Sequence, residues 1–553
     1  MKKAMKILTL LLVCIMLLSV AACNNDNGGG GSDSTAGNVS GTNTSGDDGG
    51  GSSTNTNSGG GVAGGGESNP NASDTLVIAT TSDRGTLDPA YARGGDVGNC
   101  LGMFYETLWM FDDEDNMVYK LATDLEIIEP ILWKVKLREG VKFSNGNTFN
   151  ADDVWFSLWR AHAREGHPND IRYLDLDNTK VIDEYTIQIA FTQYTVGQEI
   201  GFGGFSAVGI YDKESYVEED VPSKPIGTGP YYLDEYVVNS HVYLKAREDY
   251  WGEQPPIKNL NFVMFAEEAQ RVNALQTAAI DICAVPFQDV EYVQTLPGYG
   301  VDILQGSLTQ ALYMNLAPTS IFHDNVDARM AVALAINQKA LVNIAYNGYA
   351  TASRYPASMA NRDTDESFLD IGVYGMGYNV ELAKEYAEKA GIVGKDMLLI
   401  NNGSATNVTM CELIQESLRE IGVNVTVQSL DQGSWLVWIF DDTKYDMCID
   451  MVQSGTLSVA NAFYSWSRIG TGGDIYRDPF PNDVRYRELL DTIMMVSDPV
   501  KLKELTEEMT KIHVDSVAWY ALVDEQTATA YDSNLEVVRG RGNVILYNEC
   551  YWK

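Results

Sequence analysis

The stretch WKVKLREGVKFSNG, residues 133–146, is followed by FNADDV at 149–154, and together they decide the first folded region of this chain. Apolar residues at the start of the first stretch alternate with basic ones, which is the period of a half-buried strand. Gly140 and Gly146 predict turns in which the backbone takes a positive φ angle. Asn150 is a typical N-cap for the helix that follows. We therefore assign these residues to stability and not to ligand contact.

Periodicity predicts a different architecture later in the chain. Residues 185–191 again alternate as a strand, whereas strands and helices alternate with each other beyond residue 396. That order predicts right-handed crossovers and a parallel sheet. The segments are an apolar run at 397–400, a helix at 408–421, a strand at 423–428, a helix at 433–441 and an apolar run at 445–452. Two further helices are expected at 329–345 and, capped by Asp498-Pro499, at 498–513.

The N-terminus has the pattern of an export signal. Residues 1–22 combine three early lysines, an apolar run too short to span a bilayer comfortably, and small residues at the end. Val20-Ala21-Ala22-Cys23 resembles a bacterial lipobox, in which the cysteine is acylated and becomes the first mature residue. We expect Cys23 to be the lipidation site, and two or three acyl chains give stable anchoring. The alternative is an ordinary cleaved signal with a chance cysteine.

Residues 24–74 are rich in Gly, Ser, Thr and Asn and contain no Lys or Arg. Such a stretch behaves as a flexible coil with an r.m.s. reach of roughly 40 Å. We interpret it as a disordered linker that lifts the folded body off the membrane. A low-complexity insertion without a role is the alternative.

Charge and motifs exclude several function classes. The net charge of −37 repels nucleic-acid phosphates, so no nucleic-acid partner is expected. The five histidines show no zinc spacing, no GxSxG or phosphate-loop motif occurs, and the cysteines beyond residue 23 form no CxxC. Acidic pairs at 152–153 and 441–442 would suit a glycosidase only at a set separation, which adjacency does not supply. We expect neither an enzyme nor a metal or cofactor site, and a disulfide stays unassigned.

The opening stretch resembles the signature of the family 5 extracellular solute-binding proteins of ABC transporters, the oligopeptide, dipeptide and nickel-binding type. Other family-like pieces follow in the right order and span nearly the whole body. They are Leu87-Asp88-Pro89, Tyr105-Glu106-Thr107-Leu108, Gly227-Thr228-Gly229-Pro230-Tyr231, Asp249-Tyr250-Trp251-Gly252, Arg329 with Ala335-Ile336-Asn337, and Ala383 through Ala390-Gly391.

The resemblance implies an α/β fold of the periplasmic-binding-protein type (type II, cluster C), with two lobes and an extra inserted domain. Domain I would comprise 75–115, 225–315 and 517–553, Domain II 116–224, and Domain III 316–516. Residues 1–22 would be the signal peptide and 23–74 the anchor cysteine and linker. Segments 313–316 and 518–522 would be the hinges.

A hinged pair of lobes implies a mechanism. A solute that touches both lobes stabilises the closed form by its differential affinity for that form. The expected partners are a peptide or small-molecule solute, an ABC permease complex, and the membrane through the lipid anchor. The resemblance predicts a monomer on the extracytoplasmic face of a cell membrane of the Gram-positive type.

Domain III departs from the peptide-binding pattern of the family. In oligopeptide binders a Trp and an Asp follow the Tyr-Asp pair that stands here as Tyr445-Asp446, and the Asp pairs with the peptide ammonium. By position, Val452 replaces the Trp and Gly455 replaces the Asp. A buried unpaired ammonium costs several kcal/mol, so another carboxylate must serve or the ligand lacks that group. Asp450 is a candidate substitute, and an ordinary strand-end acid is its alternative.

Aromatic and polar residues around this departure complete the candidate ligand site. Aromatic faces with amide and hydroxyl neighbours suit a sugar ring and an apolar peptide side chain equally. Packing within the core is the alternative for each aromatic residue, and a solvated loop position is the alternative for the arginine. The candidates are Arg93, Tyr355, Asp450, Gln453, Ser454, Asn461, Tyr464, Trp466 and Trp519.

Three functions remain open from the sequence. The leading hypothesis is a tethered receptor that captures oligopeptides for an ABC importer. The same receptor for an oligosaccharide or another solute is the second, favoured by the missing Domain III Asp. A cell-surface hydrolase or an adhesin or chaperone on this scaffold is the third. A nickel receptor is disfavoured because no His-rich tract occurs.

Overall fold

The computed structural model describes residues 74–81, 83, 85–90, 96–112, 114–163, 171, 173–203, 209–265, 267–439, 441, 443–452, 458–467 and 484–553. All of them belong to one compact unit, Gly66–Lys553. The expected signal peptide, Cys23 and nearly all of the linker lie outside the described residues. Within the described part of the chain, no helix combines the length and apolar character needed to cross a membrane.

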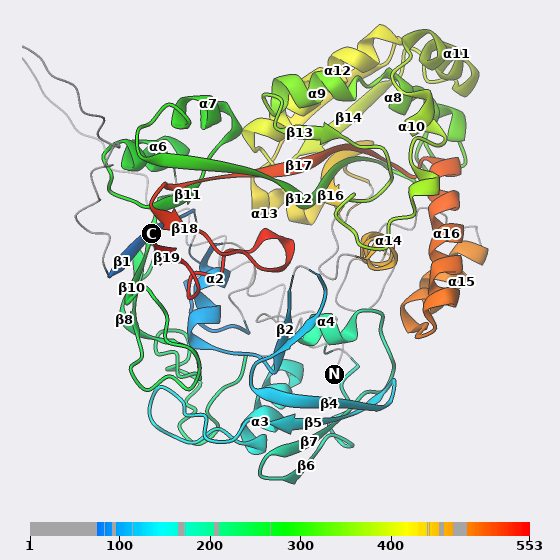
Figure 1. The fold of residues 1–553 in the computed structure, drawn as a ribbon. Helices are drawn as coiled ribbons and strands as arrows, with labels where there is room; N and C mark the ends of the chain where they lie inside the picture. Colours follow the sequence, from blue (N-terminus) through cyan, green and yellow to red (C-terminus); the bar gives the residue numbers. More distant parts are fainter. Residues whose placement is uncertain are drawn as a thin grey trace, which may run out of the picture. The chain divides into compact units, whose positions relative to one another are not determined.

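One large mixed sheet of 11 strands organises the chain (Figure 1). We call β1 and β8 to β11 the β1 half and β14 to β16 the β14 half. In sheet order the strands are β15 (Asn424–Ser429), β14 (Asp396–Asn401), β16 (Met447–Val452), β12 (Tyr299–Met314), β17 (Trp519–Asp532), β11 (Ile282–Ala284), β1 (Thr75–Thr80), β10 (Asn259–Met264), β9 (His241–Ala246) and β8 (Tyr231–Val237), with β13 (Ala350–Ala352) on β17.

Two long strands join the halves. β12 and β17 pair antiparallel along their length, and the pairing is interrupted between Gln305 and Thr309. Tyr313 lies opposite Trp519, so the two segments predicted as hinges are paired neighbours. Their hinge role stays a prediction.

The β14 half confirms the alternation expected from the sequence. β14 pairs parallel with both β15 and β16, and α12 (Ala405–Glu420) and α13 (Gln432–Trp438) connect these strands. β16 pairs antiparallel with β12, so the complete sheet is mixed. In Figure 1, α8 (Val326–Ala335), α9 (Gln338–Ala345) and α12 cover one face of this half, and α13 and α14 (Val459–Ser467) lie on the other.

The prediction of one long helix at 329–345 is wrong. The structure has two helices, α8 (Val326–Ala335) and α9 (Gln338–Ala345), because Ile336 takes an extended conformation and the side chain of Asn337 caps α9 by accepting from Ala340 N. The other expected helix is confirmed as α16 (Pro499–Ser516). Asp498 accepts from the backbone N–H groups of Val500 and Lys501.

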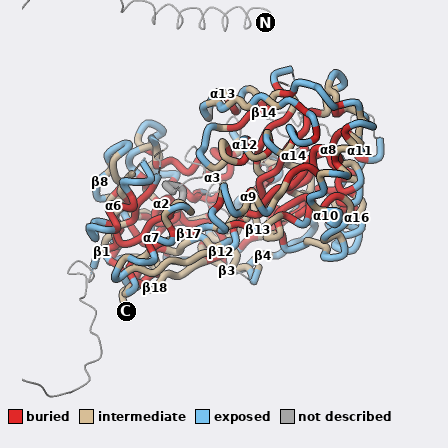
Figure 2. Tube along the Cα trace, turned by 90° about the horizontal axis from the view of Figure 1, so that it is seen from above, coloured by how far each residue is buried: buried red, intermediate tan, exposed pale blue. Residues whose placement is uncertain are grey.

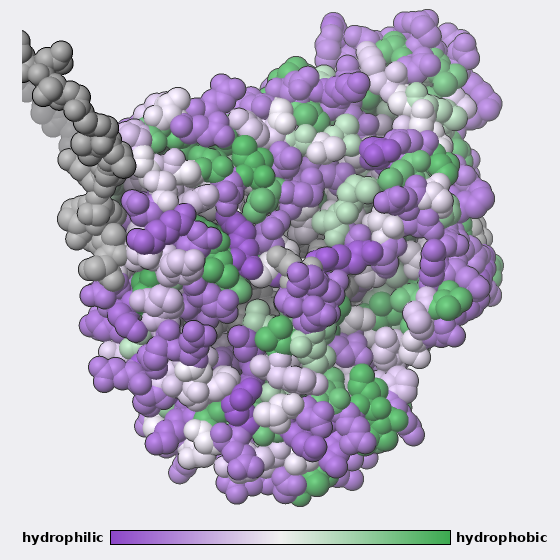
Figure 3. Space-filling model, viewed as in Figure 1, coloured by the Kyte–Doolittle hydropathy of each residue, from purple (hydrophilic) through white to green (hydrophobic). Residues whose placement is uncertain are grey.

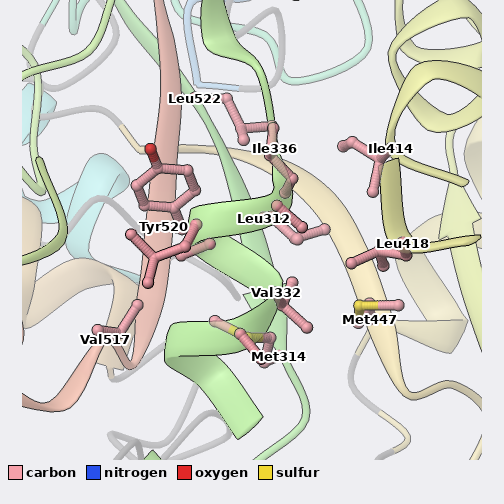
Figure 4. Close-up of a cluster of buried hydrophobic side chains, with 14 of the residues drawn as sticks. Leu312, Met314, Val332, Ile336, Ile414, Leu418, Met447, Val517, Tyr520 and Leu522 are labelled. Carbon is pink, nitrogen blue, oxygen red and sulfur yellow. The ribbon is translucent and has the colours of Figure 1, made fainter. Parts of the chain in front are cut away.

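The first core lies between the β14 half and its covering helices (Figure 4). Leu312 of β12, Met447 of β16 and Tyr520 of β17 converge there on Val332 of α8 and Leu418 of α12, and each is at most 1% exposed. Burying such side chains contributes about 1.5–3 kcal/mol each, so this core is a large source of stability in this half. Figure 2 shows α8 almost wholly in the buried colour.

A separate small sheet carries the signature stretch. Its strands, in order, are β4 (Ala122–Glu129), β5 (Leu132–Leu137), β7 (Thr186–Ala190) and β6 (Lys180–Asp183). The expected alternation is confirmed, because Trp133, Val135 and Leu137 are buried against α3 (Ala151–Ala163). Asn150 accepts from Asp152 N at 2.8 Å and donates its own N–H to Asp153 at 2.9 Å. The two hairpin strands β2 (Trp109–Phe111) and β3 (Met117–Tyr119) pack on the same core.

The remaining elements are shorter or lie at the edges. They are α2 (Asp96–Phe104), α4 (Gln198–Phe202), α6 (Glu268–Gln276), η2 (Phe287–Asp289), α7 (Val290–Val293), η3 (Glu366–Phe368), α10 (Val373–Met376), α11 (Val380–Ala390), α14 (Val459–Ser467), α15 (Val484–Thr492), η4 (Ile493–Met495), β18 (Leu535–Glu536), η5 (Arg541–Asn543) and β19 (Tyr551–Trp552). The five described cysteines are all buried free thiols.

The family-like sequence pieces meet at the seam between the β1 half and the small sheet. Asp88 is 1% exposed and accepts both terminal nitrogens of Arg160 from α3, at 3.0 and 2.6 Å. Tyr211 donates its hydroxyl to the same carboxylate at 2.7 Å. A paired, hydrogen-bonded geometry is what makes two buried charges tolerable.

Two more buried groups complete this seam, which we define by Asp88, Arg160, Glu106 and Arg247. Glu106 accepts from Tyr250 Oη and Trp251 Nε1, both at 2.7 Å, while burial raises its pKa. Arg247 donates to four backbone oxygens at 3.1–3.5 Å. Asp88 and Glu106, which belong to the family-like pieces, thus make buried contacts between segments far apart in the chain.

Candidate functional site

The second core lies on the opposite face of the β14 half. Side chains alternate along β16, so that Met447 and Ile449 enter the first core and Cys448 and Val452 enter the second. Asp450 has the parity of Cys448 and Val452 and therefore belongs to the second face. α14 packs on this face through buried Phe463.

Buried polar residues gather at the end of this face where β12 crosses from the β1 half. Thr309 lies opposite Val452 on one side and Asp524 on the other. We call the group the polar end, and its members are Thr309, Ser353, Asn361, Asp450 and Asp524, all at most 4% exposed. Buried polar side chains are unusual in an apolar core, so the polar end is our candidate for contact with a polar solute.

The polar end is only partly satisfied by its own hydrogen bonds. The Thr309 hydroxyl donates to Asp524 Oδ1, and Asp450 Oδ1 accepts Met451 N at 2.8 Å. Among the described residues, Asp524 Oδ2 and both amide atoms of Asn361 make no hydrogen bond. Burial raises the pKa of Asp524 to about 6, against hydrogen bonding from Thr309, Ser353 and the backbone of Met359, which lowers it. The polar end therefore holds two acceptor oxygens, Asp524 Oδ2 and Asn361 Oδ1, and one donor, Asn361 Nδ2, without a hydrogen-bond partner among the described residues.

The neighbouring Glu525 shows the contrast with the opposite face. It accepts Tyr346 Oη at 2.7 Å and Gln310 Nε2 at 3.0 Å. Burial raises its pKa, and these two hydrogen bonds lower it. Both of these hydrogen bonds go to Glu525 Oε1, and their donors differ from the Thr309 hydroxyl that donates to Asp524 Oδ1.

Two sequence-predicted ligand residues lie inside the second core. Tyr355 is 1% exposed, and its hydroxyl lies 2.9 Å from Thr510 Oγ1 of α16. Trp519 is 3% exposed and donates Nε1 to Pro356 O at 2.7 Å, with its ring centroid 4.0 Å from that of His513. Both positions suit packing, and their contact with ligand stays a prediction.

The other predicted residues divide into two groups. Asn461 and Tyr464 on α14 are half-buried, and Tyr464 packs against the second core. Arg93, Gln453, Ser454 and the side chain of Trp466 lie outside the described residues, as does Gly455. The structure thus brings Asp450, Asn461 and Tyr464 to one face of the β14 half.

A cavity of about 440 Å³ lies on the β1 side of the crossing strands. Gly306 to Leu308 of the interrupted β12 segment form one wall, and Gln526 and Thr527 of β17 form another. Arg539 and Asn543 from the C-terminal segment complete it. This volume lies within the range of small-molecule sites, and the cavity lies at the interruption of the β12–β17 pairing.

Sequence reasoning missed Thr309, Ser353, Asn361 and Asp524. One signal was present, because Asp524 ends the apolar run that starts at Trp519. Pairing with Thr309, more than 200 residues away, is visible only in the fold. Within the described ranges, no three His, Cys, Asp or Glu side chains cluster in a way that could hold a metal ion.

Comparison with known proteins gives the chain its relatives. Residues 116–474 match the model of "Bacterial extracellular solute-binding proteins, family 5 Middle". The chain is 24% identical over 486 residues to the glutathione-binding protein GsiB of Shigella boydii, covering 84% of this chain and 91% of that protein.

Figure 3 shows the mostly hydrophilic surface of the face seen in Figure 1, hollowed near its middle.

Solved structures share the fold at low sequence identity. DppA from Helicobacter pylori, in complex with the peptide STSA, superposes with a TM-score of 0.72 at 22% identity and covers 86% of this chain and 98% of its own. NikA from Brucella suis, in complex with Fe(III)-EDTA, gives 0.77 at 17% identity, with 87% and 100% covered. The two-lobe α/β architecture expected from the sequence is thereby confirmed.

Proposed function

Since this chain belongs to the bacterial extracellular solute-binding proteins of family 5, which are transport receptors and not enzymes, we propose that it captures oligopeptides in its interlobe cleft and delivers them to an ABC permease. It is a substrate-binding protein of an ABC importer for peptides or related solutes. The peptide class, the delivery step and the lipid tether are the proposal.

The polar end carries the peptide proposal. Gly455 leaves the position of the family's ammonium-binding Asp without charge, whereas Asp450 and Asp524 supply carboxylates on the second face. Asp524 Oδ2 is an unused acceptor, and the Asn361 amide matches a peptide group, which presents one donor and one acceptor. Relatives named for glutathione binding, or solved in complex with peptides, support a peptide ligand.

Native mass spectrometry and thermal denaturation test the proposal. The folded body, residues 75–553, is purified, examined for retained solute and then exposed to peptide pools of two to nine residues. Binding at 100 times Kd stabilises the folded form by about 2.7 kcal/mol, which raises Tm measurably. Retained peptide masses or a peptide-induced rise in Tm are expected, and a body that ignores every pool contradicts the proposal.

Matched variants locate the site. Asp524→Asn is expected to weaken peptide binding about tenfold or more, because it removes the charge that would face an ammonium. Glu525→Gln changes the next residue, on the opposite face, and is expected to leave Kd unchanged. N-acetylated peptides serve as the ligand-side control. Equal binding of free and acetylated peptides would show that no carboxylate pairs with the ammonium.

An oligosaccharide is the second candidate, favoured by Val452 and Gly455 in place of the family's Trp and Asp. Hydroxyl groups can also use Asn361 and Asp524. Hexose ladders in the native mass spectrum, together with no response to peptides, would establish this candidate over the first.

The lipid tether is tested separately. Cys23→Ala in the full chain is expected to abolish incorporation of labelled fatty acid and to release the protein from the membrane fraction. Retained label in the variant would contradict acylation at this residue.

A further inference from the structure

A single carboxylate joins three regions of the fold. Asp115 lies in the turn between β2 and β3, and its Oδ1 accepts Nε of Arg541 from the C-terminal segment at 2.6 Å. Its Oδ2 lies 3.5 Å from Nε of Arg362, which belongs to the connection between β13 and η3 in the region of the β14 half. In Figure 1 the blue β2 hairpin and the red C-terminal loop both reach into the space between the two lobes.

The turn is shaped to present this carboxylate. Asp115 has a φ of 62°, in the left-handed region that Asp and Asn tolerate better than most residues. Its N–H donates to Asp112 O at 3.1 Å, and Asp112 N donates to Asn116 O at 3.1 Å. Arg541 is only 12% exposed, whereas Arg362 is 44% exposed. The contact with Arg541 is therefore the firm one, and the contact with Arg362 is the one that can open to water.

A second contact reaches the β14 region from the segment that follows the small sheet. Val196, in that segment after β7, donates its N–H to Met494 O of η4 at 2.8 Å. Its side chain is 9% exposed and belongs to the second core of the β14 half, and Tyr194 packs there as well. An apolar side chain from the small sheet thus sits in the core of the other region.

We infer that the Arg362–Asp115 ion pair and the Val196 contact together hold two lobes closed when no solute is bound. One lobe contains the β14 half, and the other contains the β1 half and the small sheet. The partly exposed ion pair contributes little, so its loss is expected to raise the open-to-closed ratio by about two- to fivefold. Loss of the apolar contact has a larger effect, because burial of a valine side chain outweighs an exposed ion pair. A receptor with this bias binds solute by reopening a closed form.

Distance measurements on the solute-free body test the inference. Nitroxide labels on p-acetylphenylalanine at Lys180 of β6 and Glu385 of α11 avoid the free cysteines. The protein is unfolded, stripped of solute, refolded and checked empty by native mass spectrometry. Pulsed electron resonance then gives the distance distribution. Wild type is expected to show one short population, and Val196→Asp a dominant longer one.

Two variants test the ion pair separately from the Val196 contact. Asp115→Asn keeps a residue that tolerates the positive φ, and Arg362→Gln removes the cation that faces Asp115 from the β14 region. Each is expected to add a longer population, and the double variant no more than Asp115→Asn alone, because that variant already lacks the charge that Arg362 faces. Raising the salt concentration to about 1 M should open the wild type partway, since the Debye length falls to about 3 Å.

A matched control lies within one region. Arg354 and Asp370 pair on the surface of the β14 region, so Arg354→Gln is expected to leave the distances unchanged. The inference is overturned if Arg362→Gln matches wild type, if Arg354→Gln opens the body equally, or if wild type is already open. No solute enters these measurements, so a failed peptide screen leaves their outcome unaffected.

Discussion

The seam and the polar end both bury charge, but they treat it differently. At the seam, Asp88 and Arg160 satisfy each other through two hydrogen bonds, and Tyr211 adds a third. At the polar end, Asp524 has one bonded and one unbonded carboxylate oxygen. Fully paired buried charges fix a fold, whereas incompletely paired ones leave capacity for a ligand. The difference separates scaffold from site within one chain.

The largest expected loss of stability comes from a variant that breaks the buried ion pair of the seam. Asp88→Ala leaves the Arg160 guanidinium, 7% exposed, without its main partner. Removal of one member of a buried pair costs about 3–5 kcal/mol, so the urea midpoint should fall markedly. Peptide affinity of the fraction that remains folded should be unchanged.

Lys136→Ala provides the control for this change. Its pair with Asp124 is 3.1 Å long, but the two side chains are 58% and 51% exposed. A loss below about 1 kcal/mol is expected. Equal losses in the two variants would remove the distinction between buried and exposed pairs.

The second expected effect is a pH-dependent difference in stability at the polar end. The pKa of Asp524 is raised to about 6 from 3.8, so its contribution to stability is fully present below pH 3.8 and is lost as pH rises through 6. Asp524→Asn lacks this loss. At pH 7.5 the variant should be more stable than wild type by roughly 2–3 kcal/mol, and the gap should close near pH 4.

Other titrating groups stay the same in both proteins. Burial raises the pKa of Asp153 to about 6 and lowers that of His513 to about 3. Only the difference between wild type and Asp524→Asn across pH 4–7.5 therefore reports Asp524. A constant difference across that interval would mean that its carboxyl group does not titrate there.

The smallest expected effect concerns Tyr355. Tyr355→Phe removes the hydrogen bond with Thr510 and leaves the ring in place. A loss of about 0.5–1.5 kcal/mol in the free energy of unfolding is expected, with the Kd for peptide unchanged if the ring only packs. A rise in Kd of tenfold would assign this residue to the ligand site instead.

Local patterns predicted much of the fold. The alternation of apolar residues at 133–137 and the Asp498-Pro499 cap report interactions between near neighbours in sequence, so both could be read directly. The break between α8 and α9 was missed because apolar periodicity continues through Ile336. In the structure α8 ends there, and the side chain of Asn337 caps the start of α9. Helix boundaries depend on such single side chains.

The candidate site was less predictable. Asp450 was found because the family pattern drew attention to its neighbours, and the structure places it on the same face as Val452. Thr309 and Asp524 come from strands far apart in sequence, and nothing local marks them as partners. Long-range pairing decides which polar residues meet, so a single sequence cannot specify them.

The position of β17 has a consequence for biogenesis. This strand follows every other strand of the large sheet in the chain, yet it lies between β12 and β11, near the middle of that sheet. A chain truncated before Trp519 would leave two unpaired strand edges, which invite aggregation. The nascent protein therefore cannot complete its sheet until Trp519–Asp532 has been synthesised, and a protein with a stop codon before Trp519 should be degraded instead of accumulating.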